Sequence, residues 1–145
     1  MAFRHRLFAA VAMALVGGAA CADIQHIVVF RYKANVTADK KAEIARKFLE
    51  LRNVAQRDGQ PYITSIKGGD AISKEGFDRG LEQAFVVSFK NEADRNFFVG
   101  KPYGNEMDPA HRALAQIVEP LLATDETGKP VGLFVFDFDD ARLAR

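Results

Sequence analysis

The order of the periodic segments along the chain constrains its fold more than any other feature of the sequence. Apolar and polar residues alternate in residues 24–33, which predicts a strand with one strongly apolar face. Segments with similar strand signals, bounded by glycine, proline or polar turn residues, are 62–67, 83–90 and 131–138. The last of these is apolar on both faces. The sequence therefore predicts four strands.

Two longer segments have the apolar spacing of amphipathic helices. The first begins after a candidate N-cap at Thr37, and the turn at 58–61 ends it. The second spans 109–122 with apolar residues turned inward, and Pro120 predicts a kink or an early end. A short helix is expected at 93–98, and loops or turns are expected at 71–82, 99–107 and 124–129.

The resulting order is strand, helix, strand, strand, helix, strand. It predicts an α+β, ferredoxin-like fold, which is a four-stranded antiparallel sheet with its helices on one face and the other face bare. Large apolar side chains recur at alternate positions in two strands, as Phe85, Val87 and Phe89 and as Phe134, Phe136 and Phe138. A bare face with such side chains favours a homodimer in which two sheets pack face to face, a dimeric α/β barrel. The alternative is a monomer whose loops cover the sheet.

The first 22 residues have the layout of a secretory signal peptide. A basic start precedes an apolar stretch and the small residues Ala20-Cys21-Ala22, which fit cleavage after Ala22. Residues 23–145 would then form a single domain, periplasmic or secreted, with no stable membrane span, because the apolar stretch is too short for a permanent anchor. The alternatives are a retained anchor or tail, and lipidation at Cys21. Lipidation fits less well because Gly18 stands where that motif usually has leucine.

The composition of that domain excludes several classes of function. Cleavage removes Arg4 and Arg6 from the 20 basic residues, so 18 remain against 19 acidic residues, and a net charge of −1 gives no basic face for nucleic acid. Cys21 is the only cysteine, so no disulfide and no thiol chemistry is expected after cleavage. With two remaining histidines, no His-Glu-x-x-His pattern and no phosphate loop, we expect neither a metal site nor a cofactor.

The two histidines of the domain are the candidate catalytic residues. His26 lies on the apolar face of the first strand, and His111 opens the helix that Asp108 caps and Pro109 begins. If both face the space between sheet and helix, they would line one ligand pocket, for which a void of roughly 300 Å³ is the usual lower size. The positive helix end disfavours a proton on His111, so its neutral ring could act in acid–base chemistry. The alternative is that both residues are structural. His111 would then be a polar residue at a helix start, and His26 a buried histidine with one hydrogen-bond partner.

Four further residues are candidates for ligand binding. Phe30 is a neighbour of the first histidine on its strand face, and Leu114 lies on the inward face of the helix. Tyr103 could gate the pocket or donate a hydrogen bond from its loop, and Phe98 ends the short helix. Asp137, flanked by two phenylalanines, is interpreted as the exposed end of the last strand.

Several stretches together resemble the stress-responsive dimeric α/β barrel (Dabb) family. They are "HIVVFRYK", "GGDAISKEGFDRG" running into "FVVSF", "DPAH" and "VFDF". The resemblance covers about residues 24–138 and implies small homodimers of ferredoxin-like subunits. One plant branch of the family closes polyketide chains by an aldol condensation without a cofactor, and its two histidines match His26 and His111. The nearest counterpart of its catalytic tyrosine is Phe98, and Asp108 replaces the first histidine of its His-Pro-Ala-His element.

Three functions are open at this point. The first is an exported stress-response or accessory protein that binds a small aromatic or carbonyl ligand. The second is a cofactor-independent acid–base enzyme, either polyketide cyclase-like or a related lyase or isomerase, with His111 as general base and His26 orienting it. The third is a dimeric interaction module without an active pocket. The fold alone does not separate the three.

Overall fold

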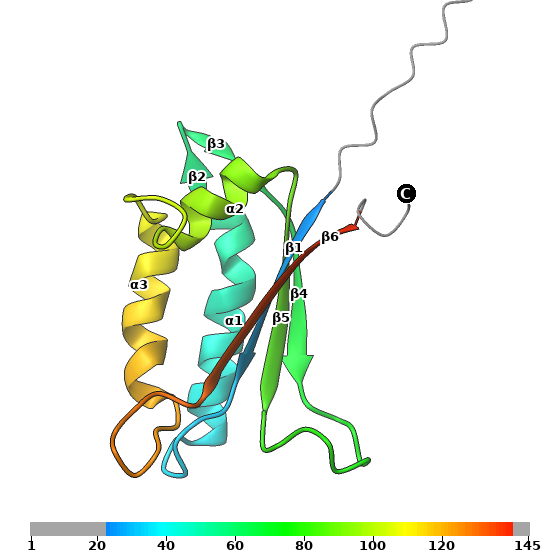
Figure 1. Ribbon diagram of the computed structural model, residues 1–145, viewed down its shortest axis with the longest axis vertical. Coiled ribbons are helices and arrows are strands. Elements are labelled where there is room, and N and C mark those ends of the chain that lie inside the picture. Colours follow the sequence, from blue (N-terminus) through cyan, green and yellow to red (C-terminus); the bar gives the residue numbers. More distant parts are fainter. Residues whose placement is uncertain (1–22, 141–145) are drawn as a thin grey trace, which may run out of the picture.

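The computed structural model describes residues 23–140, and the predicted signal peptide lies outside them. The described residues form a layer of helices against a sheet (Figure 1). In chain order the elements are β1 (Ile24–Phe30), α1 (Ala38–Val54), β2 (Gln56–Arg57), β3 (Gln60–Pro61), β4 (Ile63–Asp70), β5 (Gln83–Phe89), α2 (Glu92–Val99), α3 (Pro109–Val118), the 3₁₀ turn η1 (Glu119–Leu121) and β6 (Leu133–Asp139).

The predicted four-stranded sheet is confirmed. Its strands lie in the order β4, β5, β1, β6, and each neighbouring pair is antiparallel. This is the strand order of a ferredoxin-like fold. The helices α1, α2 and α3 all lie on one side of the sheet, and the other side carries no helix of residues 23–140 (Figure 1). We call that other side the open face.

Side-chain alternation decides which strand residues reach the core. In β1 the buried positions are Ile24, His26, Val28 and Phe30, and the positions between them are half-buried. Val87 pairs with His26, so the alternate apolar residues of β5 also point toward the helices, and they are fully buried. The expectation that Phe85, Val87 and Phe89 add to the bare face is therefore wrong.

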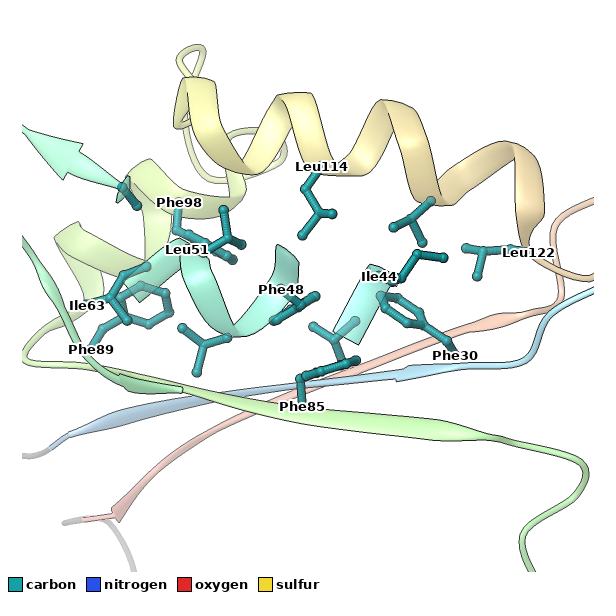
Figure 2. Packing of buried hydrophobic residues seen from close by; sticks show 14 of the residues in the cluster. Phe30, Ile44, Phe48, Leu51, Ile63, Phe85, Phe89, Phe98, Leu114 and Leu122 are labelled. Carbon is teal, nitrogen blue, oxygen red and sulfur yellow. The ribbon is translucent and has the colours of Figure 1, made fainter. Parts of the chain in front are cut away.

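The hydrophobic core lies between the sheet and the helices (Figure 2). The ring of Phe48 from α1 stacks on Phe85 at 4.1 Å between centroids, and Phe30 meets Phe48 edge-on at 6.0 Å. Leu114 points from α3 toward the sheet (Figure 2), and Val118 is buried one turn further along. The two ring contacts join α1 to β5 and to β1.

Three details differ from the sequence prediction. α1 ends at Val54, before the expected turn, because β2 and β3 pair as a small hairpin. The turn of this hairpin has positive φ at Asp58 (52°) and Gly59 (74°). β4 continues through Gly68 and Gly69 to Asp70 rather than ending before them. The early end of the last helix before Pro120 is confirmed, but Ile117 is 37% exposed instead of turned inward.

β6 is an edge strand with apolar side chains exposed on both faces. On the open face the exposed fractions are 49% for Phe134, 53% for Phe136 and 38% for Phe138. On the helix side, Leu133 and Val135 are each 48% exposed. β6 therefore forms a half-open wall beside the core.

Candidate functional site

His26 is held by a carboxylate on the neighbouring strand. The register of β1 and β6 sets His26 opposite Asp137, and both side chains lie on the helix side. Asp137 Oδ1 lies 2.6 Å from His26 Nδ1. Because an ionised carboxylate only accepts hydrogen bonds, Nδ1 carries the proton, and the lone pair of the neutral ring is on Nε2. His26 is only 4% exposed, so this bond and the surrounding packing fix the ring.

Asp137 is held in turn by a residue of α2. Its second oxygen, Oδ2, accepts a hydrogen bond from Nη1 of Arg95, which is buried. Arg95 Nε also donates to Asn96 Oδ1 at 2.9 Å, and the Tyr103 ring centroid lies 4.0 Å from the guanidinium carbon. His26, Asp137 and Arg95 therefore form a chain of hydrogen bonds with the Asp137 carboxylate in the middle.

His111 comes from the first turn of α3, as predicted. Asp108 is the N-cap, and its Oδ1 accepts from the His111 backbone N–H at 2.8 Å. The Asp108 side chain is fully buried, and its Oδ2 accepts from the Tyr62 hydroxyl at 2.9 Å. His111 Nδ1 lies 2.8 Å from the Phe98 carbonyl oxygen. A carbonyl only accepts, so here too Nδ1 donates and Nε2 carries the lone pair.

Phe98 joins the two histidines. Its ring stacks on His111 at 3.9 Å with an interplanar angle of 8°, and it meets the edge of His26 at 5.9 Å. Both imidazoles line one cavity of about 190 Å³ between α3 and strands β1 and β6. Apart from the two histidines and Glu119, the lining side chains are apolar.

The Nε2 atoms of both histidines reach this cavity. Neither has a hydrogen-bond partner among residues 23–140, yet no side chain of that range leaves a buried polar atom unpaired. Each Nε2 is therefore in contact with accessible space, and the cavity is the space that both rings line. Its volume of about 190 Å³ is below the usual size of ligand pockets, but cavities of roughly 150 Å³ hold benzene.

Burial lowers the pKa of both histidines. For His26 the loss of hydration outweighs the Asp137 carboxylate, which raises the pKa, and the Arg95 charge lowers it further. For His111 burial is again the largest cause, the Phe98 carbonyl raises the pKa, and the nearby His26 lowers it. The direction predicted for His111 agrees with this, and burial is the largest cause of the lowered pKa. Both rings are neutral near pH 7 and have a lone pair to offer.

The four candidates for ligand binding lie in different places. Phe30 and Leu114 line the cavity. Phe98 is fully buried behind the histidine rings and is not part of the wall. Tyr103 does not line the cavity either, because its ring packs on Arg95 instead, and it is 48% exposed. A direct role of either residue in gating or contacting a ligand thus lacks support from their positions.

Sequence reasoning missed Asp137 and Arg95. The interpretation of Asp137 as an exposed strand end is wrong, because its carboxylate bonds His26 and Arg95. A signal was present, since Asp137 alternates with Leu133 and Val135 on a face that is otherwise apolar. Arg95 gave no signal, because one arginine in a short helix is unremarkable.

Two other properties concern residues 23–140 as a whole. Within this range, no cluster of three or more histidine, cysteine or acidic side chains could hold a metal ion. None of the helices in the same range has the length and apolar character needed to cross a membrane.

Comparison with known proteins points to one family. A family model described as Stress responsive A/B Barrel Domain (Dabb) matches residues 24–140. The chain is similar in structure to a hydroxynitrile lyase from Passiflora edulis, with 21% identity, a TM-score of 0.62, and coverage of 82% of this chain and 94% of that one. No protein of curated function matches the chain.

Two further solved structures share the fold. A protein from Arabidopsis thaliana is 18% identical, with a TM-score of 0.61 and coverage of 79% of this chain and 92% of that one. A dimeric ferredoxin-like protein of unknown function from Thermobifida fusca is 21% identical, with a TM-score of 0.57 and coverage of 81% and 91%. At these identities the likeness concerns the fold alone.

Proposed function

The chain belongs to the stress responsive A/B barrel domain (Dabb) family, and on this premise we propose that it binds a small, mostly apolar molecule with one hydroxyl or carbonyl oxygen and moves a proton on it without a cofactor. The observation that carries the proposal is the 2.6 Å pairing of His26 Nδ1 with the Asp137 carboxylate, at the wall of an otherwise apolar cavity. Family membership by itself names no reaction.

In this proposal His26 is the general base. The Asp137 carboxylate fixes the tautomer with the lone pair on Nε2, and it stabilises the imidazolium that forms when Nε2 takes a proton. His111, whose Nδ1 donates to the neutral Phe98 carbonyl, would offer its Nε2 as a second hydrogen-bond acceptor for a ligand hydroxyl. These roles are the reverse of those expected from the sequence, because the carboxylate lies behind His26 and not behind His111.

The cavity limits the ligand to a small one. A volume of about 190 Å³ suits a molecule of roughly the size of a substituted benzene ring. The half-exposed Leu133 and Val135 leave the β6 side open, so a longer ligand could extend outward there. Apolar walls with two ring nitrogens favour one polar group on an otherwise apolar molecule.

A second, narrower candidate is the cleavage of a small hydroxynitrile. It is motivated by the Passiflora edulis hydroxynitrile lyase, which shares the fold. His26 Nε2 would take the hydroxyl proton while the oxygen forms a carbonyl. The bond to the nitrile carbon would break, with its electron pair leaving on cyanide, and the imidazolium would return the proton to cyanide. This reaction needs no group beyond those of the site.

Binding is tested by comparing phenol with toluene, two molecules of similar shape that differ in one hydroxyl. By isothermal titration calorimetry we expect phenol to bind about tenfold more tightly, since one hydrogen bond to an imidazole contributes about 1.4 kcal/mol. His26→Gln and His111→Gln should reduce that preference. Equal binding of both molecules, or binding of neither, would contradict the proposal.

Turnover is tested separately by NMR. Exchange of the α-protons of small aryl ketones in D₂O, and cleavage of small hydroxynitriles, should both be lost in His26→Gln. Binding without turnover in the unaltered protein would favour an accessory binding protein over an enzyme. Binding of no ligand would favour the dimeric interaction module.

We further propose that the domain is exported and acts as a homodimer. The exposed Phe134, Phe136 and Phe138 support a partner on the open face, and the Thermobifida fusca protein with this fold is dimeric. Export rests on the sequence of residues 1–22. Mass spectrometry of the protein from a periplasmic fraction should give a chain that begins at Asp23. A retained N-terminus or a lipid on Cys21 would contradict this.

A further inference from the structure

Arg95 lies behind the site rather than in its wall. Its side chain contacts Asp137 and Tyr103 and does not line the cavity of the two histidines. Resting on the proposed function, we propose that Arg95 is a positioning residue: as the permanent counter-cation of Asp137 it fixes the carboxylate and keeps the His26 imidazole neutral, with Nε2 ready to accept a proton.

One carboxylate, that of Asp137, faces two groups able to carry positive charge. Asp137 Oδ1 bonds His26, and Oδ2 bonds Arg95. Arginine keeps its charge at any pH a folded protein meets. The carboxylate is therefore shared with a permanent cation, so it stabilises a positive charge on the buried His26 less than an unshared carboxylate would. Without Arg95, a protonated His26 would become the counter-cation of Asp137.

The remaining groups around His26 do not replace Arg95. β5 presents Val87 opposite His26, and α1 contributes Phe48 to the same cavity. α3 contributes His111, whose own pKa is lowered by burial. Two more carboxylates, Glu92 of α2 and Asp139 of β6, lie with Arg95 and Asp137 around a neighbouring surface hollow. Arg95 is the cation that the structure shows bonded to Asp137.

Tyr103 holds Arg95 in this place. Its ring lies 4.0 Å from the guanidinium carbon, in a position that covers one face of the cation and favours it electrostatically. Tyr103 belongs to the loop between α2 and α3, so the conformation of this loop acts on His26 through Arg95 and Asp137. The expected influence of Tyr103 on the site is thus indirect.

The chain offers a matched control for this arrangement. Arg57 also bonds a carboxylate, Asp94 at 3.0 Å, and lies 5.5 Å from the Phe97 ring centroid. Its side chain is 37% exposed, and its carboxylate partner has no bond to a histidine. Replacing Arg57 therefore breaks the same kinds of contact at a place where neither His26 nor Asp137 is bonded.

The test is an NMR titration of the His26 ring in the full chain with ¹⁵N-labelled histidine, assigned through His26→Gln. Arg95→Met should raise the titration midpoint of His26 by about one pH unit, a tenfold gain in proton affinity. Arg95→Lys should restore most of the original midpoint, because it keeps the charge. Tyr103→Ala should give a smaller rise, and Tyr103→Phe none, because the ring stays. Arg57→Met should leave the midpoint unchanged.

An unchanged His26 midpoint in Arg95→Met, or an equal rise in Arg57→Met, would overturn the inference. If Arg95→Met does not fold, the two Tyr103 variants test the inference instead. A rise of the His26 midpoint in Tyr103→Ala but not in Tyr103→Phe supports it, and equal midpoints in both variants would overturn it. The titration needs no ligand, so its failure leaves the binding and turnover tests untouched. Conversely, equal binding of phenol and toluene would refute the proposed function without changing the effect of Arg95 on His26.

Discussion

Two imidazoles with different partners are the basis of the site. His26 bonds the ionised Asp137, whereas His111 bonds the neutral carbonyl of Phe98. A carboxylate stabilises a developing imidazolium more than a neutral carbonyl does. For this reason proton transfer is assigned to His26, and His111 is assigned as a hydrogen-bond acceptor for a ligand hydroxyl.

The first prediction concerns the variant Asp137→Asn. It should reduce any proton transfer at the site by about 100-fold or more, because the amide does not stabilise an imidazolium. It should also lower the free energy of unfolding by about 1–3 kcal/mol, since the buried Arg95 loses its carboxylate. Urea unfolding and α-proton exchange measure the two effects. Arg57→Met, which breaks a partly exposed pair, should cost less than about 1 kcal/mol, and equal losses in both variants would refute the prediction.

The second prediction concerns pH. Both histidines have folded-state pKa values below their ordinary 6.5, so below pH 6.5 the unfolded chain binds more protons than the folded one. Their contribution to stability is therefore complete above that pH and is lost as the pH falls toward the folded-state values. The Tm from calorimetry should fall between about pH 7 and about pH 5.5. His111→Gln should show a shallower fall, and a Tm that stays flat in the unaltered protein would contradict the assignment.

Local sequence patterns predict where helices and strands lie better than they predict which strand residues pair. Alternation places β1, other strand signals place β5 and β6, and the Asp108-Pro109 pair fixes the start of α3. The meeting of His26 with Asp137 depends on the register between strands 111 positions apart in the chain. Register is a non-local property that side-chain periodicity alone does not set. The cavity was therefore predictable in outline, whereas the carboxylate behind it was not.

The glycine pair of β4 shows the same limit. The expectation that Gly68-Gly69 ends the strand is wrong, because Gly68 serves a close approach inside the sheet. A Cβ at Gly68 would lie 2.4 Å from Phe85 Cδ1 and 2.5 Å from the Ala84 carbonyl oxygen. At Gly69 nothing lies within 4 Å of the same position. The close approach of Phe85 and of the Ala84 carbonyl to Gly68 distinguishes the two.

The third prediction follows from that difference. Gly68→Ala should lower the free energy of unfolding by about 1–3 kcal/mol, because the added methyl group displaces the fully buried Phe85. Gly69→Ala is the matched control and should be neutral or slightly stabilising, since it reduces the freedom of the unfolded chain. Chemical denaturation of both variants measures the effect. Equal stability of the two would show that β4 does not approach Phe85 in this way.

For the whole molecule, the open face is the main unexplained surface. Helices cover one side of the sheet (Figure 1), and three phenylalanines of β6 are exposed on the other side. Contiguous apolar patches on a soluble domain usually mark an interface. The homodimer proposed here would cover this patch and would leave the histidine cavity on the opposite side of each sheet.

The fourth prediction tests that assembly. Phe136→Glu places a charge in the proposed interface and should convert the dimer into a monomer, as measured by light scattering coupled to size-exclusion chromatography. Val54→Glu is the matched control, because Val54 at the end of α1 is 52% exposed and Phe136 is 53% exposed. The control should remain dimeric. A monomeric unaltered protein, or dimers of both variants, would contradict an interface on the open face.

The most direct measurement of the central claim is the ¹⁵N NMR spectrum of the His26 ring near neutral pH, recorded before and after phenol is added. We expect a protonated Nδ1 and an unprotonated Nε2 in the protein alone, since Nδ1 donates to Asp137. Phenol should then shift the Nε2 signal toward that of a hydrogen-bonded acceptor and leave Nδ1 nearly unchanged. A proton on Nε2 before phenol is added, or no change of its signal at saturating phenol, would contradict a base at this cavity.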